Sequence, residues 1–205
     1  MAATFSPTVH IGTETQLTDG GSKLTLNWEE MYALALELAD GIEQHAIETG
    51  ESFDVMAVLP RGGYFPALIL SRRFGFRAHQ IVHLGLTSYR DGETQRSDEI
   101  IGQTPNGEEI AGRNVLLVDE VCDSGHTLMQ ATHRLARLGA HTVRSAVLHY
   151  KPERSETGYV PDIYAASYNG WVVYPGEPDE AHAQFSCVNR ANHAPALVDI
   201  ETRTV

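Results

Sequence analysis

Residues 115–128 read VLLVDEVCDSGHTL, and this stretch predicts both the fold class and the place where the chemistry occurs. The apolar residues at 115–118 indicate a buried strand, and the acids Asp119 and Glu120 follow at its end. The turn after them opens a helix that we expect to cover about 126–138. A buried strand that leads through a short turn into a helix is typical of parallel α/β sheets.

The turn Ser124-Gly125-His126-Thr127 has the chemistry of a phosphate-binding site. It places hydroxyls and backbone N–H groups at the positive end of a helix, and Gly125 lets the backbone approach a ligand closely. The acid pair before the turn does not suit phosphate, because two like charges about 4 Å apart repel by roughly 4 kcal/mol at an effective dielectric constant of 20. Such a pair suits sugar hydroxyls or a divalent cation. Together, these features predict a phosphorylated sugar as ligand.

The rest of the chain alternates helices and strands around this unit. Helical periodicity with end signals predicts helices, and short apolar runs predict strands. In chain order, we expect a helix from Asn27 to Gly50, a strand at 53–59, a helix from Pro66 to Gly75, a strand at 78–86, the strand at 115–118, the helix at 126–138 and a strand at 143–150. This order predicts an α/β fold around a mostly parallel sheet, with ligands at the carboxyl ends of its strands.

Three segments fall outside this alternation. Residues 1–26 are expected to form loops and one strand. The polar stretch at 87–113 is expected to be a functional lid or a disordered segment, because so long a connection is unusual in a compact domain. Residues 160–174 contain two strand-like pieces around Asn169-Gly170, which predict a hairpin that forms a small subdomain with the N-terminal residues.

The charge balance argues against two classes of partner. Of the 205 residues, 27 are acidic and 15 are basic, so the formal charge of −12 opposes binding to nucleic-acid phosphates or to anionic lipid. The cysteines, Cys122 and Cys187, are too few for a disulfide framework and match no zinc-binding spacing. No apolar run approaches the roughly 20 residues that span a bilayer, and residues 1–20 show no signal pattern. We therefore expect a cytoplasmic protein with no nucleic acid and no membrane among its partners.

The 115–128 stretch resembles the phosphoribosyl-pyrophosphate (PRPP) motif of the type I phosphoribosyltransferases: an apolar strand, two acids, two further residues and then Asp-Ser/Thr-Gly-x-Thr. The resemblance covers a phosphoribosyltransferase domain at about 25–178. It implies a central, mostly parallel sheet flanked by helices, with a small hood formed by N- and C-terminal segments. Residues 1–24 would be an N-terminal extension that contributes to the hood, and residues 179–205 a tail without an assigned role.

The resemblance implies a role for each residue of the motif. Asp119 and Glu120 would hold the ribose hydroxyls and, directly or through water, Mg²⁺. Asp123 would lie near N7 of a purine and take part in proton transfer, as a catalytic residue. The residues implied to bind PRPP and its 5′-phosphate are Asp119, Glu120, Asp123, Ser124, Gly125, His126 and Thr127, of which His126 contributes only its backbone N–H.

Arg61-Gly62-Gly63, after the first predicted strand, resembles the pyrophosphate loop of this family. A cation beside unhindered N–H groups suits a diphosphate leaving group, so Arg61 and Gly62 are implied to bind pyrophosphate, and Arg61 to act in catalysis. The family often has a cis peptide before this residue, here Pro60–Arg61. By itself, Arg-Gly-Gly is also a common turn.

Ser88-Tyr89, at the start of the polar stretch, matches the Ser-Tyr of the mobile catalytic loop in the purine members of the family. Both residues are implied to bind pyrophosphate, and Tyr89 to act in catalysis by closing over the reacting sugar and excluding water. An exposed loop tyrosine without a function is the alternative.

Lys151-Pro152 and Trp171-Val172 resemble the base-binding residues of bacterial xanthine-guanine phosphoribosyltransferases and related enzymes. By this resemblance, Lys151 donates to the purine 6-oxo group, Trp171 stacks on the base, and the backbone of Val172 meets the 2-position. A surface lysine and a core tryptophan are the alternatives. The Pro-Trp-Asp/Glu of the family is replaced by Pro-Gly-Glu at 175–177, which leaves the packing of the base pocket open.

These features predict a Mg²⁺-dependent purine-salvage phosphoribosyltransferase. It would convert PRPP and a 6-oxopurine (hypoxanthine, guanine or xanthine, which the sequence does not rank) to the nucleoside 5′-monophosphate and pyrophosphate. The family implies a homodimer or homotetramer. Two alternatives stay open here: a PRPP-binding regulator that controls gene expression through nucleic acid, and a phosphoribosyltransferase for another base.

Overall fold

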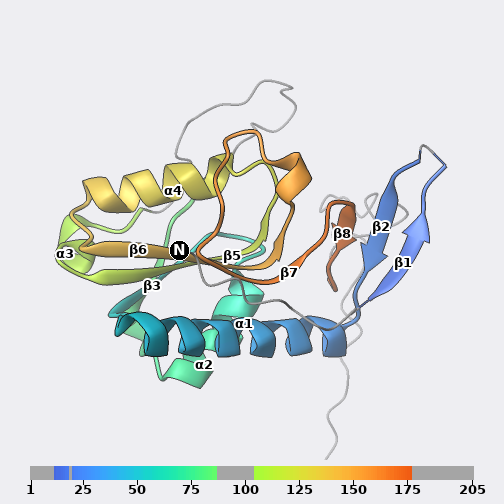
Figure 1. Cartoon of the computed structure of the whole chain (residues 1–205). Coiled ribbons are helices and arrows are strands. Elements are labelled where there is room, and N and C mark those ends of the chain that lie inside the picture. Colours follow the sequence, from blue (N-terminus) through green and yellow to red (C-terminus); the bar gives the residue numbers. More distant parts are fainter. Residues whose placement is uncertain (1–11, 19, 87–103, 177–205) are drawn as a thin grey trace, which may run out of the picture. The chain divides into compact units, whose positions relative to one another are not determined.

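A computed structural model of the chain describes residues 12–18, 20–86 and 104–176 (Figure 1). Its main sheet has the strand order β4-β3-β5-β6-β7 and every pairing in it is parallel. The strands are β3 (Val55–Val58), β4 (Ile81–His83), β5 (Asn114–Cys122), β6 (Thr142–Tyr150) and β7 (Ile163–Ser167). A second sheet has the order β1-β2-β8, with β1 (Thr13–Gln16), β2 (Ser22–Thr25) and β8 (Trp171–Val173). The predicted α/β fold with a mostly parallel sheet and a small hood is confirmed.

Helices cover both faces of the main sheet. On one face lie α1 (Trp28–Thr49) and α2 (Tyr64–Phe74), and on the other lies α4 (His126–Arg137) (Figure 1). Short helical turns complete the described chain: α3 (Gly107–Ile110) and two 3₁₀ turns, η1 (Ala78–Gln80) and η2 (Pro152–Arg154). None of the helices in the described ranges is long and apolar enough to cross a membrane.

The central strands are buried on both faces because successive side chains point to opposite sides. On β5, Leu116 and Val118 pack in the apolar cluster that includes α1 and α2, whereas Val115 and Leu117 pack in the cluster that includes α4. A parallel strand covered on both faces reads as an unbroken apolar run, which is the pattern at 115–118.

The ends of α1 follow from its sequence. The Asn27 side chain accepts a hydrogen bond from the Glu30 N–H (2.9 Å), and the Glu30 side chain accepts one from the Asn27 N–H (2.8 Å). Gly50 ends the helix in the left-handed region, with φ of 72°. The predicted helix from Asn27 to Gly50 is therefore confirmed.

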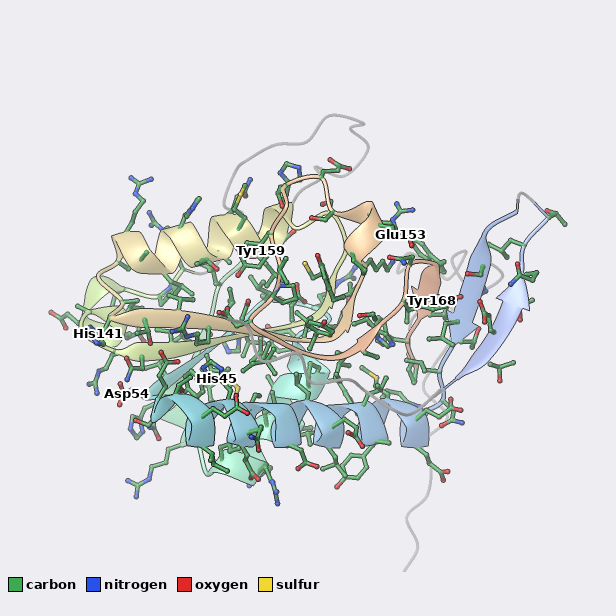
Figure 2. All side chains as sticks on the ribbon, in the orientation of Figure 1. His45, Asp54, His141, Glu153, Tyr159 and Tyr168 are labelled. Carbon is green, nitrogen blue, oxygen red and sulfur yellow. The ribbon has the colours of Figure 1, made fainter. Side chains whose placement is uncertain are left out.

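The predicted hairpin at 160–174 is wrong. β7 adds to the main sheet, where Ile163 pairs in parallel with Ala146, and β8 pairs in parallel with β2 instead. The two strands separate because Ile163 and Ala165 are buried in the α1 cluster, which makes β7 an edge of the main sheet. Tyr168 then bridges to the second sheet through a 2.8 Å hydrogen bond to Ser22 (Figure 2).

Four further predictions also need correction. The strand at 115–118 continues through Asp119 and Glu120 to Cys122, because β6 also pairs with Asp119, Val121 and Cys122. The strand at 78–86 is a 3₁₀ turn followed by β4, and the described part of residues 1–26 holds two strands rather than one. The polar stretch does not extend to 113 as a lid, since Asn106 and Glu109 cap α3 reciprocally and Ile110 is fully buried; residues 87–103 lie outside the described part.

Candidate functional site

Three of the predicted motifs meet at one edge of the main sheet, where β3, β5 and β6 end. Because these strands are parallel neighbours, the loops that follow them lie side by side. Backbone hydrogen bonds continue past the strand ends: Leu59 N–H donates to Val118 O (3.0 Å), and Lys151 N–H donates to Cys122 O (3.0 Å). The loop of Arg61, the turn after Cys122 and Lys151 are thereby held together.

The loop of Arg61 packs directly against the acid pair. A Cβ at Gly62 would overlap the Glu120 carboxylate, and a Cβ at Gly63 would lie 2.6 Å from Leu59 O and 2.7 Å from Val118 O. Backbone oxygens therefore exclude a larger residue at Gly63, whereas a side chain at Gly62 would force the Glu120 carboxylate to move. The Pro60–Arg61 peptide bond is cis, as the resemblance led us to expect, and Arg61 itself is exposed.

The acid pair carries an unfavourable concentration of negative charge. Burial, together with the neighbouring Glu120 carboxylate, raises the pKa of Asp119 well above its usual value. A hydrogen bond from the Glu120 N–H to Asp119 Oδ1 (2.8 Å) offsets part of this effect. A cation or a set of sugar hydroxyls at this position would relieve the repulsion.

These carboxylates could hold Mg²⁺ if it arrives with a phosphorylated substrate. The described ranges contain no cluster of three or more His, Cys, Asp or Glu side chains able to hold a metal by themselves. Mg²⁺, however, is usually bound through one or two carboxylates plus substrate phosphates. Asp119 and Glu120 provide such a pair, beside the loop suited to a diphosphate, so the residues fit this metal.

The turn after β5 is shaped by the segment that follows η2. Ser124 O accepts hydrogen bonds from the Glu156 N–H (3.0 Å) and the Thr157 hydroxyl (3.2 Å), which fixes the orientation of the turn. Gly125, the N-cap of α4, has φ of 86°, and a Cβ there would collide with the Thr157 hydroxyl oxygen. Since Gly125 has no side chain, it caps none of the N–H groups in the first turn of α4, which suits an anion.

The other predicted phosphate ligands lie at the start of the same helix. His126 and Thr127 are the first two residues of α4. The His126 Nε2 lies 3.4 Å from a carboxylate oxygen of Glu156, so this side chain is directed to the neighbouring segment. This contact is compatible with the predicted role of the His126 backbone N–H, which stays a prediction.

Asp123, Lys151 and Trp171 are brought together beside this turn. The Lys151 ammonium donates to Asp123 Oδ2 (3.1 Å) and lies 5.7 Å from the centre of the Trp171 ring. The Lys151 side chain is only 5% exposed, whereas Trp171 is 61% exposed and offers an aromatic surface to a ligand. The alternatives of a surface lysine and a core tryptophan are therefore wrong.

Val172 lies where its backbone can meet a ligand. Its side chain is buried, and it pairs with Leu24 of β2. Val173 O accepts a hydrogen bond from the Leu26 N–H, which places this carbonyl on the β2 side. In a strand, neighbouring residues direct their N–H and C=O groups to opposite sides, so those of Val172 point to the edge of the second sheet that no other described strand covers.

Two cations contact Asp123, and one of them, Arg154, was not predicted from the sequence. Arg154 Nε donates to Asp123 Oδ1 (2.8 Å) while Lys151 donates to the other oxygen. Burial by itself would raise the pKa of Asp123, but the hydrogen bond from Arg154 and the charge of Lys151 outweigh it and hold the pKa below its usual value. A Lys-Pro-x-Arg pattern is the signal that could have found Arg154, because residues three apart in a 3₁₀ turn lie on the same side.

A buried chain of hydrogen bonds behind the acid pair was also missed. Tyr174 donates from its hydroxyl to Glu120 O (3.1 Å), and the same hydroxyl lies 2.8 Å from His149 Nδ1. Burial and the charge of Lys151 lower the pKa of His149 to about 4, so its ring is neutral at pH 7. Nothing in the sequence separates this histidine from an ordinary core residue of a strand.

Two further parts of the sequence analysis, the Ser88-Tyr89 pair and Gly176, do not belong to this group of contacts. Ser88 and Tyr89 are outside the described residues, so their roles stay predictions. Gly176, which replaces the family tryptophan, has φ of 89°. A tryptophan would be strained in that conformation, which gives a backbone reason for glycine here.

Comparison with known proteins agrees with this geometry. The model of the phosphoribosyl transferase domain family matches residues 26–180. Among curated proteins, the chain is 26% identical to a xanthine-guanine phosphoribosyltransferase of Roseobacter denitrificans (73% of this chain, 82% of that protein) and 28% identical to xanthine phosphoribosyltransferase 1 of Saccharomyces cerevisiae (70% and 86%). Among solved structures, a purine phosphoribosyltransferase of Pyrococcus horikoshii aligns with a TM-score of 0.59 and 27% identity (77% and 95%). The resemblance inferred from the sequence is confirmed.

Proposed function

Because the chain belongs to the family of phosphoribosyl transferase domains, we propose that it transfers the phosphoribosyl group of PRPP to a 6-oxopurine and releases pyrophosphate. The product is the nucleoside 5′-monophosphate, as in purine salvage, and the candidate acceptors are hypoxanthine, guanine and xanthine. The observation that carries the proposal is the meeting of Asp123, Lys151 and Trp171 beside a turn suited to phosphate.

The residues of the first two loops are proposed to bind PRPP. The turn from Ser124 to Thr127 takes the 5′-phosphate on the N–H groups of α4, and Asp119 with Glu120 takes the ribose hydroxyls. Mg²⁺ bound by that acid pair and the substrate would neutralise charge on the diphosphate. Arg61 and the adjacent N–H groups would stabilise the pyrophosphate as it leaves, with Ser88 and Tyr89 closing over it.

The purine is proposed to lie on Trp171 with its polar edge toward Lys151. Stacking on such a ring contributes roughly 1–3 kcal/mol per base. The Lys151 ammonium is only a donor, so it pairs with a 6-oxo group and opposes the 6-amino group of adenine. Both curated relatives above are named for xanthine, and one also for guanine, which supports this class of acceptor.

Asp123 is proposed to take the proton that the purine loses. It is a carboxylate at neutral pH and can accept the N7–H, and its lowered pKa makes it a weaker base while Lys151 and Arg154 are both bonded to it. As the bond between sugar C1 and pyrophosphate breaks, N9 of the base forms the new bond to C1, and the N7 proton passes to Asp123. The reaction then depends on orientation and charge stabilisation rather than on a covalent intermediate.

The remaining expectations from the sequence are kept as proposals. The phosphoribosyltransferase domain would be residues 25–178, residues 1–24 would contribute to the hood, and residues 179–205 would form a tail without an assigned role. The protein would act in the cytoplasm as a homodimer or homotetramer. The reported relatives are phosphoribosyltransferases, and no observation favours the gene-regulatory alternative.

The direct test is a PRPP-dependent assay of the full chain with Mg²⁺ and hypoxanthine, guanine, xanthine, adenine or uracil as acceptor. We expect 5′-monophosphate only from the 6-oxopurines, and Asp123→Asn should lower turnover about 100-fold. Asp40→Asn, an exposed aspartate on α1, is the matched control and should leave turnover unchanged. Nucleotide from none of the bases, or from adenine as readily as from hypoxanthine, would refute the proposal.

A further inference from the structure

We propose that Arg154 is a positioning residue that holds the Asp123 carboxylate in place and thereby leaves Lys151 available to the purine. The inference rests on the proposed function and adds to it a residue that the motifs do not include. Arg154 bonds one carboxylate oxygen of Asp123 (2.8 Å) and Lys151 bonds the other (3.1 Å). Each oxygen therefore has its own cation.

Both cations come from one short, well-anchored segment. Lys151 and Arg154 are three residues apart across η2, so their side chains project to the same side. The turn is closed by the Arg154 N–H, which donates to Lys151 O (3.1 Å), and Lys151 is itself tied to Cys122 O. Glu153, between them, donates its N–H to Asn169 Oδ1 (3.0 Å), and Figure 2 shows it at this turn.

The two cations have different surroundings, which assigns them different roles. Lys151 is 5% exposed and lies by the Trp171 ring, where a stacked base would sit. Arg154 is 60% exposed and reaches Asp123 from the solvent side. Its other charged neighbour is Glu156, which lies beside His126. Only Lys151 is therefore placed to exchange its bond to Asp123 for one to the base.

This exchange explains why a second cation is needed. When Lys151 turns to a 6-oxo group, Asp123 Oδ2 loses its donor and becomes the acceptor for the N7–H. Without Arg154 on Oδ1, the carboxylate would then be free to rotate and to move away from the base. A displacement of about 1 Å in a positioned group can cost about 100-fold in rate. The planar guanidinium is preorganised, so less side-chain freedom is lost per hydrogen bond than with an ammonium.

A double-mutant cycle tests this role because Arg154 is proposed to act only through Asp123. The four proteins are the wild type, Arg154→Gln, Asp123→Asn and the double variant. The readout is the Kd of 9-deazahypoxanthine, measured by calorimetry with Mg²⁺ and PRPP present. This analogue keeps the N7–H and has carbon at position 9, so binding is measured without turnover.

We expect Arg154→Gln to weaken binding of the analogue about tenfold in the wild-type background and to have no effect in the Asp123→Asn background. Arg154→Lys should restore part of the affinity. Arg137→Gln makes the same change at an exposed arginine at the end of α4. This control should change neither the Kd of the analogue nor the melting temperature.

Three results would overturn the inference, and they differ from failure of the proposed function. Equal losses for Arg154→Gln in both backgrounds would show that Arg154 acts independently of Asp123. No loss of affinity for the analogue in either background would show that Arg154 does not act on base binding at all. Failure of Arg154→Lys to restore affinity would contradict a role for the positive charge of Arg154. Absence of nucleotide synthesis and of analogue binding in the wild type would instead refute the proposed function, and this inference with it.

Discussion

Replacement of Tyr174 by phenylalanine tests whether the buried chain behind the acid pair holds the site together. The Tyr174 hydroxyl donates to Glu120 O (3.1 Å), so the proton between this hydroxyl and His149 Nδ1 (2.8 Å) must come from the histidine. Phenylalanine keeps the ring and removes only the oxygen that joins these two groups. The apolar packing of residue 174 is therefore retained.

The expected loss follows from burial. Tyr174 is 4% exposed and His149 is 1% exposed, so water has little access to replace the missing hydroxyl. A buried polar group left without its partner costs about 1–3 kcal/mol. We expect Tyr174→Phe to lower the free energy of unfolding by about 2 kcal/mol, which corresponds to a fall of roughly 4–8 °C in Tm for a chain of this size.

The assay is denaturant unfolding followed by circular dichroism, together with the KM for PRPP. Tyr32→Phe is the control, because Tyr32 is 48% exposed and its change should stay within about 0.5 kcal/mol. The KM for PRPP should rise in Tyr174→Phe, since the Glu120 carbonyl loses a hydrogen bond that helps to hold its backbone in place. Wild-type stability in Tyr174→Phe, or an equal loss in Tyr32→Phe, would refute the reasoning.

The remaining predictions concern titration and the glycine loop. Because the pKa of His149 is lowered from 6.5 to about 4, the unfolded chain binds a proton in that range that the native protein does not, so stability should fall by about 3 kcal/mol as the pH drops from 6.5 to 4. A His149→Gln variant that shows the same fall would contradict this. A hydrogen bond from Arg144 lowers the pKa of Glu51 to about 2. Glu51→Gln should therefore lower the free energy of unfolding by about 1 kcal/mol above pH 4.5, after allowance for the partial exposure of Glu51, and by less as the pH falls toward 2. Chemical denaturation at several pH values measures the effects at both His149 and Glu51. Gly62→Ala should raise the KM for PRPP about 10-fold or more, because its Cβ would overlap the Glu120 carboxylate, whereas Gly107→Ala, which meets no atom within 4 Å, should leave it unchanged. Equal KM values in the two glycine variants would show that the close approach is unimportant.

The fold was predictable where one local pattern has one physical solution. The run at 115–118 is apolar at every position, so it had to be covered on both faces, and helices on both sides of a parallel sheet provide that cover. The pieces at 163–167 and 171–173 are short, and their own residues do not specify a partner. Pairing was decided by distant groups, α1 for β7 and β2 for β8, which is why the hairpin prediction failed.

The candidate site also contains residues that the local sequence could predict and residues that it could not. Ser124, Gly125 and Thr127 are consecutive or nearly so, and a turn that opens a helix favours anions, so a phosphate-binding role could be predicted from the sequence. Arg154 and Tyr174 contact Asp123 and Glu120, which lie 31 and 54 positions away in the chain. Contacts of that separation exist only after the sheet has formed, and no pattern of neighbouring residues encodes them.

The distribution of the three loops over β3, β5 and β6 makes the protein modular. Groups suited to the sugar phosphate follow β3 and β5, while those suited to the base follow β6 and lie on β8. Exchange of side chains at 151–153 and 171–173, which leaves Arg154 and Tyr174 in place, is therefore expected to alter the choice of nucleobase and to leave the groups suited to the sugar phosphate undisturbed. A selection experiment that randomises only those two short stretches could redirect the catalyst to new acceptors while its leaving-group chemistry stays intact.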